Sequence, residues 1–95
     1  MDEVDLVVVG FGGAGAAAAI TAHDAGATVV VLEKQAEGAH TPSTRMSGGL
    51  VMAADSAADG AAYLDACAGG MVPSDVTAAW AESATDVLDW LGKTA

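Results

Sequence analysis

The sequence predicts an α/β fold that starts with a βαβ unit. Two valine-rich runs, residues 5–9 and 28–32, are apolar over most of their length and are each long enough for a strand. Such runs are typical of parallel strands that are covered on both faces. An alanine-rich stretch lies between them, and glycines cluster where it begins. A strand, a crossover helix and a second, parallel strand are therefore expected within about 30 residues.

The crossover helix is expected over residues 14–25, because alanine has the highest intrinsic helix propensity. Gly26 is suited to the left-handed cap that ends many helices, and the crossover should be right-handed. Residues 34–50 then mix Gly, Pro, Ser and Thr without periodicity, which predicts a long loop. A loop of this length inside a compact domain is usually functional.

A first helix is expected after the loop. Ser56 and Asp59 have the spacing of a capping box variant, and Gly69 and Gly70 provide a stop after Ala68. One face of this helix would carry four apolar residues: Ala57, Ala61, Leu64 and Ala68.

A second helix is expected to begin with Ser74 as its cap and to end at Gly92. Apolar residues recur along it at steps of three and four, which predicts a buried stripe. The stripe consists of Val76, Trp80, Ala84, Val87 and Leu91. Trp80 and Trp90 are interpreted as core or interface residues.

Composition excludes several classes of protein. The chain has 95 residues, a net charge of −10 and three cationic side chains, a balance that argues against nucleic acids and anionic lipid surfaces as partners. No apolar stretch approaches the ~20 residues that span a bilayer, so membrane insertion is not expected. Residues 1–9 lack the basic start of a secretory signal, which favours a cytoplasmic location. Cys67 has no partner for an internal disulfide and is interpreted as a small buried residue.

The motif Gly10-x-Gly12-x-x-Gly15 follows the first predicted strand and opens the helix. In a dinucleotide-binding fold, the first glycine allows a tight turn, the second lets the backbone approach a pyrophosphate, and the third lets helix and strand pack closely. The alternative is that these glycines only form a tight turn between a strand and a helix. The agreement of both strands, the helix and Gly26 with the motif favours dinucleotide binding.

Other groups near the motif complete a candidate site. Gly13 and Ala14 add backbone N–H groups at the helix N-terminus, where phosphate is favoured. Glu33 follows the second strand and is placed to accept hydrogen bonds from a ribose 2′-hydroxyl, which disfavours NADP. Lys34, the next residue, is included in the candidate site. The motif alone leaves FAD and NAD open.

Two segments carry a resemblance to a known family. The segments "VDLVVVGFGGAGAAAAITAHDAGATVVVLEK" and "STRMSGGL" resemble the flavoproteins of fumarate reductase and succinate dehydrogenase, a family that includes 3-ketosteroid dehydrogenases. The resemblance extends over essentially all 95 residues. It implies an FAD-dependent oxidoreductase that moves hydride between flavin and a carbon–carbon bond, acting on a small-molecule substrate. The electron partner is left undetermined.

The resemblance also implies that the loop after the second strand runs along the flavin. The cofactor-binding candidates in this loop are Ser43, Thr44, Ser47, Gly48 and Gly49. Their alternative interpretation is an ordinary surface turn.

Relatives that bind FAD covalently use a histidine of this loop. The corresponding position is Pro42, and His40 is two residues away, so FAD is expected to be non-covalent. His40 is interpreted as a solvated loop residue. Arg45 is either a ligand of phosphate or of a substrate carboxylate, or a solvated cation.

The chain shows no pattern of catalytic residues and no metal-ligand cluster, so none is predicted. The resemblance places the substrate-binding and acid–base residues, and a later glycine–aspartate motif for FAD, in other segments. The expectation is that residues 1–95 are the N-terminal portion of a truncated Rossmann-like FAD-binding domain and inactive alone. The alternatives are a segment of an NAD-dependent dehydrogenase and a non-catalytic dinucleotide-binding fragment; the residues from Ser43 to Gly49 favour FAD over NAD.

Overall fold

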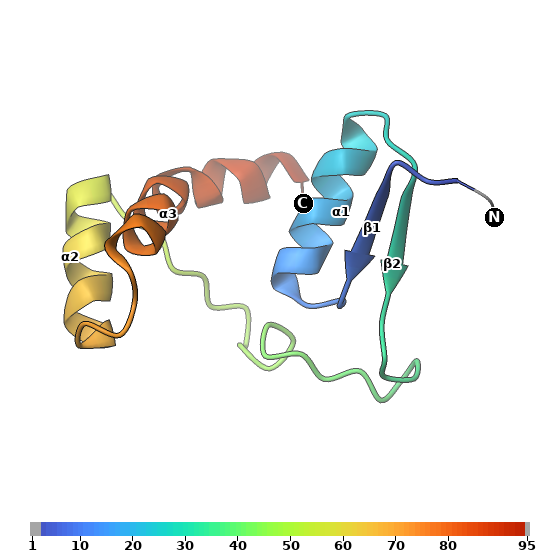
Figure 1. Ribbon diagram of the computed structural model, residues 1–95, viewed down its shortest axis with the longest axis horizontal. Helices are drawn as coiled ribbons and strands as arrows, with labels where there is room; N and C mark the ends of the chain where they lie inside the picture. The colour runs from blue at the N-terminus through green and yellow to red at the C-terminus, as the bar shows by residue number, and fades with distance from the viewer. Residues whose placement is uncertain (1–2, 95) are drawn as a thin grey trace. The chain divides into compact units, whose positions relative to one another are not determined.

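A computed structural model describes residues 3–94 of the chain. It contains the strands β1 (Leu6–Val9) and β2 (Val29–Leu32) and the helices α1 (Gly13–Asp24), α2 (Ala57–Ala68) and α3 (Ser74–Thr94) (Figure 1). The elements form two compact units, Met1–Leu50 and Val51–Ala95. The predicted α/β fold, with a βαβ unit, a loop and two helices, is confirmed.

The first unit is a parallel β1–β2 pair with α1 beside it (Figure 1). The register pairs Leu6 with Val29 and Val9 with Leu32. The strands were expected to be covered on both faces. Of the residues in β1 and β2, however, only Val8 is buried, and Val9 is 83% exposed. The reason is that a single helix packs on this two-stranded sheet, so apolar surface is left open.

Both ends of α1 lie within one residue of the predicted ends. The helix begins one residue before the predicted start and ends at Asp24. Gly26 has φ +92°, and its N–H donates to the carbonyl of His23 over 2.9 Å. The expected role of this glycine at the helix end is therefore confirmed.

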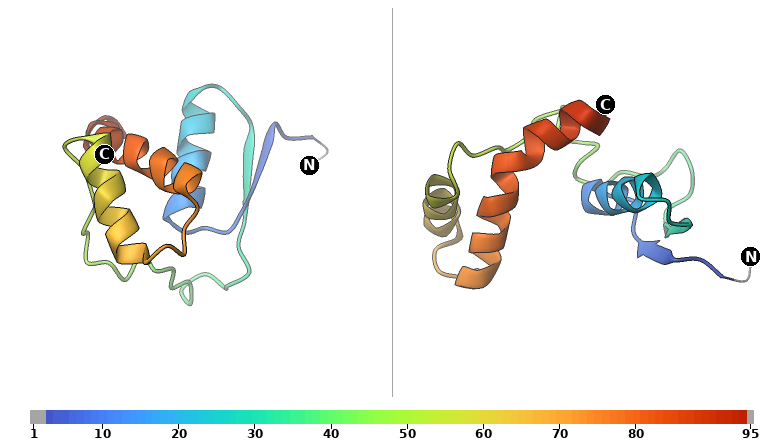
Figure 2. Two further views of the ribbon diagram at one scale, coloured as in Figure 1. Left: turned by 60° about the vertical axis from the view of Figure 1, so that its left-hand side comes forward. Right: turned by 90° about the horizontal axis from the view of Figure 1, so that it is seen from above.

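The second unit is a helical hairpin in which α2 and α3 pack together (Figure 2). Ser56 is confirmed as the N-cap of α2, because its Oγ accepts the N–H of Asp59 over 3.1 Å. Gly69 ends α2 in the left-handed conformation, as expected. The predicted apolar face of α2 is half-buried, and Gly60 on the same side is fully buried.

Helix α3 differs from its prediction in three ways. It continues through Gly92 to Thr94, and Ser74 is its first residue rather than its cap. Val76 is 51% exposed, while Thr77, Ala81 and Ala84 are buried. The small residues Thr77 and Ala81 form the buried face because they allow close approach between the helix backbones. The remaining stripe positions are confirmed as buried or half-buried: Trp80, Ala84, Val87 and Leu91.

Candidate functional site

The glycine turn, residues 10–15, connects β1 to α1. Gly10 has φ +101°, a conformation that side chains rarely adopt, and its N–H donates to the carbonyl of Leu32 over 2.7 Å. A Cβ on Gly15 would overlap the carbonyl oxygen of Gly10 and would lie 3.2 Å from Val8 Cγ1. The turn itself therefore accounts for both glycines.

Gly12 is different, because neither its conformation nor its surroundings require glycine. Its φ of −97° and ψ of −168° are extended values that any residue adopts. A Cβ on Gly12 would meet only Pro42 Cβ, at an ordinary 3.8 Å. The open space at this backbone position is the feature that a closely approaching ligand would need.

The N-terminus of α1 carries backbone donors at the same place. Gly12 is the N-cap and has no side-chain cap hydrogen bond, and the first turn of α1 contains no acidic residue. The first N–H groups of a helix lack partners within the helix, and the helix dipole adds positive partial charge there. This end of α1, including Gly13 and Ala14, is chemically suited to an anion such as a pyrophosphate.

The cofactor loop, residues 34–50, lies against the glycine turn. A Cβ on Gly13 would be 2.5 Å from Thr44 Oγ1, so this loop residue occupies the space beside the first residue of α1. A cavity of about 370 Å³ lies between the two segments. Its lining residues are Phe11, Gly12, Gly13, Ala16, His40, Pro42, Thr44 and Arg45.

The remaining loop candidates form a series of tight turns. Ser47 Oγ donates to the carbonyl of Thr44 over 2.7 Å and accepts the N–H of Gly49 over 3.3 Å. Gly48 and Gly49 have φ values of +69° and +83°, so both positions favour glycine. The exposed Ser43 accepts the N–H of Met46 on its carbonyl. The structure thus brings Thr44 to the glycine turn and uses Ser47 to shape the loop.

Glu33 directly follows β2 and connects the end of that strand to the glycine turn. Its Oε2 accepts the N–H of Phe11 over 2.8 Å, and its Oε1 accepts the N–H of Gln35 over 3.0 Å. These backbone donors, Gln35 first and then Phe11, lower the pKa of Glu33. The carboxylate is therefore charged and fixed at the edge of the candidate site, whereas Lys34 is exposed.

His40 is not a solvated loop residue, as the sequence had suggested. Its ring stacks on Phe11 with centroids 5.4 Å apart and an interplanar angle of 11°, and its side chain is only 17% exposed. Nε2 lies 3.3 Å from Glu33 Oε2. Arg45 Nη1 donates to the carbonyl of His40 over 2.7 Å, so this guanidinium is engaged with its own loop.

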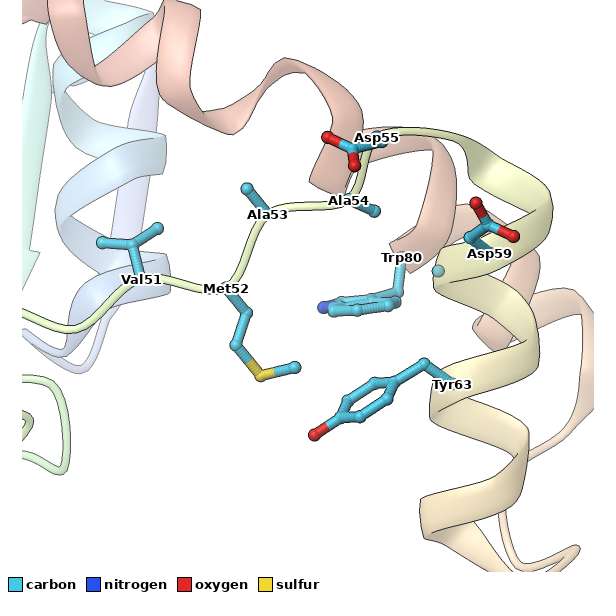
Figure 3. Close-up of a pocket in the computed structure, with 9 residues that line it drawn as sticks. Val51, Met52, Ala53, Ala54, Asp55, Asp59, Tyr63 and Trp80 are labelled. Atoms are coloured by element: carbon cyan, nitrogen blue, oxygen red, sulfur yellow. The ribbon is translucent and has the colours of Figure 1, made fainter.

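The second unit has its own cavity, of about 360 Å³. Figure 3 shows the rings of Trp80 and Tyr63 beside the side chain of Met52. Trp80 is half-buried there, in keeping with the interpretation of it as a core residue.

Cys67 is exposed, so the expectation of a buried cysteine is wrong. A hydrogen bond with Cys67 raises the pKa of Tyr63.

Two further observations concern residues 3–94. No group of three or more His, Cys, Asp or Glu side chains in this range is placed to hold a metal ion. No helix in the same range is long and apolar enough to cross a membrane.

Comparisons of the chain with known proteins identify its relatives. A family model described as FAD binding domain matches residues 5–94. The 3-oxo-5-alpha-steroid 4-dehydrogenase of Comamonas testosteroni is 36% identical over 103 residues, which cover 97% of this chain and 19% of that enzyme. No solved structure matches the chain significantly.

Shorter matches involve reductases. A fumarate reductase (cytochrome) of Shewanella frigidimarina is 62% identical over 34 residues, covering 36% of this chain and 6% of that enzyme. A urocanate reductase of Eggerthella lenta is 69% identical over 32 residues, covering 34% of this chain and 5% of that enzyme. The chain thus spans less than a fifth of the length of each of these relatives.

The family match decides between the two dinucleotides that the glycine motif left open. It covers the glycine turn, Glu33, the cofactor loop and both helices of the second unit. The chain belongs to the FAD-binding domain family, and its cofactor is FAD.

Proposed function

We propose that these residues are the N-terminal portion of a Rossmann-like FAD-binding domain in a longer oxidoreductase. The enzyme would transfer hydride between flavin and a carbon–carbon bond of a small-molecule substrate. The names of the steroid dehydrogenase and fumarate reductase relatives support this reaction class. The exposed Val9 and the open two-stranded sheet support further strands and helices in the complete domain. Substrate and acid–base groups would come from those other segments.

Within this domain, the glycine turn would bind the FAD pyrophosphate through the backbone N–H groups of Gly12, Gly13 and Ala14. Gly10 and Gly15 would hold the turn in shape. Glu33 would accept hydrogen bonds from the adenosine ribose, using the lone pairs that its two backbone donors leave free. Lys34, the residue after Glu33, would add a positive charge at this end of the site.

The cofactor loop would line the flavin end of FAD. Bound FAD supplies a flavin ring that accepts and returns hydride. The loop residues would position this ring: Ser43, Thr44, Ser47, Gly48 and Gly49. The left-handed turns at Gly48 and Gly49 expose backbone without side chains, so a flat ring can approach closely.

The observation that carries the proposal is the open space at Gly12. A glycine needed only for a tight turn would have a strained conformation or a close protein neighbour, and Gly12 has neither. Gly12→Ala should therefore leave the protein folded but reduce FAD affinity at least ~100-fold, because the added methyl occupies the position of the pyrophosphate. Gly12→Val should abolish binding.

The test is a fluorescence titration of the full-length apoprotein with FAD, combined with thermal denaturation of the same samples. Gly92→Ala is the matched control, because a Cβ there would meet no atom within 4 Å. Wild-type FAD affinity in both Gly12 variants would show that the pyrophosphate lies elsewhere.

We also propose that FAD is bound without a covalent link. Pro42 stands where a flavin-linking histidine is expected, and His40 is held against Phe11 and Glu33. Acid denaturation of the full-length protein should release the yellow colour into the supernatant. Colour that stays with the precipitated protein would contradict non-covalent binding.

A further inference from the structure

Three residues fasten the cofactor loop to the glycine turn, and the proposed function gives a role in FAD binding to only one of them, Glu33. His40 of the loop stacks on Phe11 of the turn. The N–H of Phe11 donates to Glu33 Oε2, and His40 Nε2 lies 3.3 Å from the same oxygen. Each residue thus contacts the other two, although 29 positions separate the two rings in the sequence. The cluster connects three segments: the glycine turn, the end of β2 and the loop.

The polar edge of His40 is left without a satisfactory partner. Nε2 is buried and makes no hydrogen bond within residues 3–94, because the contact with Glu33 is close without hydrogen-bond geometry. Buried polar atoms are normally hydrogen-bonded, so such an exception calls for an explanation. The same ring lines the 370 Å³ cavity together with Gly12 and Gly13.

We propose that His40 is a positioning residue for the adenosine–pyrophosphate end of FAD, holding the Glu33 carboxylate and the cofactor loop in their binding arrangement. This inference rests on the proposed function of Glu33 and the glycine turn. The aromatic stack fixes the loop beside the turn. The ring also places Nε2 3.3 Å from Glu33 Oε2, so the imidazole closes one side of the space around the carboxylate.

The stack and the ring nitrogen make separate contributions. The stack joins the loop to the glycine turn, whereas Nε2 lies beside the carboxylate that would bind the ribose. Loss of the stack should therefore weaken FAD binding more than loss of the nitrogen alone.

Two substitutions separate the stack from the ring nitrogen. His40→Phe keeps an aromatic ring against Phe11 but removes Nε2, and His40→Ala removes both. His23 is the matched control, because it is an exposed histidine late in α1. FAD and ADP are each titrated into the full-length apoprotein of wild type and of each variant at one pH. ADP reports on the adenosine–pyrophosphate end alone.

His23→Ala should bind both ligands as tightly as wild type. His40→Ala should bind both about tenfold more weakly, because the loop is released from the glycine turn. His40→Phe keeps the stack and should recover most of this loss.

Wild-type affinity for FAD and ADP in His40→Ala would overturn the inference and leave the proposed function intact. A change for FAD without a change for ADP would also overturn it, since His40 would then act on the flavin end. A wild type that binds FAD but not ADP, with affinity unaffected by Gly12→Ala, would contradict the proposed function itself.

Discussion

In both units of the molecule a glycine permits a close approach, but the groups that approach each other differ. In Met1–Leu50, the glycine turn brings backbone against backbone, since a Cβ on Gly15 would overlap the carbonyl oxygen of Gly10. In Val51–Ala95, Gly60 brings two helices together, and the nearest atoms to a Cβ there would be the methyl groups of Ala54 at 3.0 Å and Ala81 at 3.4 Å, followed by Ala81 Cα at 3.6 Å.

The difference shows which glycines can be replaced. A backbone carbonyl in a tight turn cannot move without changing the turn, whereas helices that touch through methyl groups can separate by a few tenths of an ångström. The first unit therefore depends on Gly15 for the geometry of the turn, and the second depends on Gly60 for packing between helices.

The largest expected effect is that of Gly15→Ala. The new Cβ overlaps Gly10 O and presses on Val8 Cγ1, so the turn and the only buried residue of β1 must both shift. We expect a loss of roughly 3 kcal/mol or more in the free energy of unfolding, together with loss of FAD. Urea denaturation of the full-length protein and its flavin content measure the two effects. Normal stability with full flavin content would show that the turn adapts more readily than its geometry indicates.

A smaller effect is expected for Glu33→Gln, which tests charge at the site while its shape is kept. The lowered pKa keeps Glu33 ionised at neutral pH. The change therefore replaces a charged carboxylate, which accepts hydrogen bonds from two backbone N–H groups, with a neutral amide. FAD affinity should fall about tenfold, because hydrogen bonds to a charged acceptor are replaced by weaker neutral ones. Glu37→Gln, an exposed loop carboxylate, is the control. Equal FAD affinity in both variants would place the ribose away from Glu33.

The elements that the sequence predicted well are those whose signals are local. The N-cap at Ser56 and the glycine ends at Gly26 and Gly69 each depend on a few neighbouring residues, and each was found where expected. The glycine motif also predicted the turn between β1 and α1. These features depend on backbone conformation, which nearby residues determine.

The features that the sequence did not predict depend on contacts between distant residues. The stack of His40 on Phe11 and the hydrogen bond from Phe11 to Glu33 join positions more than 20 residues apart. No local pattern distinguishes His40 from a solvated loop residue. Helix α3 was misread for a related reason, because its buried face is set by the small residues that α2 can approach, which exposes Val76.

Asp5→Asn tests a second link between the strands of the first unit. Asp5 Oδ2 accepts the N–H of Thr28 over 2.8 Å and its hydroxyl over 2.9 Å, and these bonds lower the pKa of Asp5. A lowered native pKa stabilises the fold above the unfolded-state value of about 3.9, and this stability is lost as pH falls through the native value. The variant should melt at a lower temperature than wild type at pH 7, with the difference shrinking below pH 4. Asp86→Asn, an exposed site on α3, is the control. A difference that persists unchanged at pH 3 would show that charge is not involved.

The smallest effect is expected for Gly60→Ala, the counterpart of Gly15→Ala in the second unit. Alanine improves helix propensity by about 1 kcal/mol relative to glycine. The new methyl group contacts Ala54 and Ala81 closely, which costs about 1 kcal/mol if neither moves. Ala54 lies before α2, outside both helices, so it can shift slightly while its N–H keeps the hydrogen bond to the carbonyl of Ala84. The two terms nearly cancel, and the free energy of unfolding should change by less than about 1 kcal/mol, with FAD binding unaltered.

Gly92→Ala, with no neighbour within 4 Å, isolates the propensity term and should be neutral or slightly stabilising. A loss from Gly60→Ala as large as that from Gly15→Ala would mean that methyl contacts between helices are as rigid as a backbone turn, and the contrast between the two units would fail.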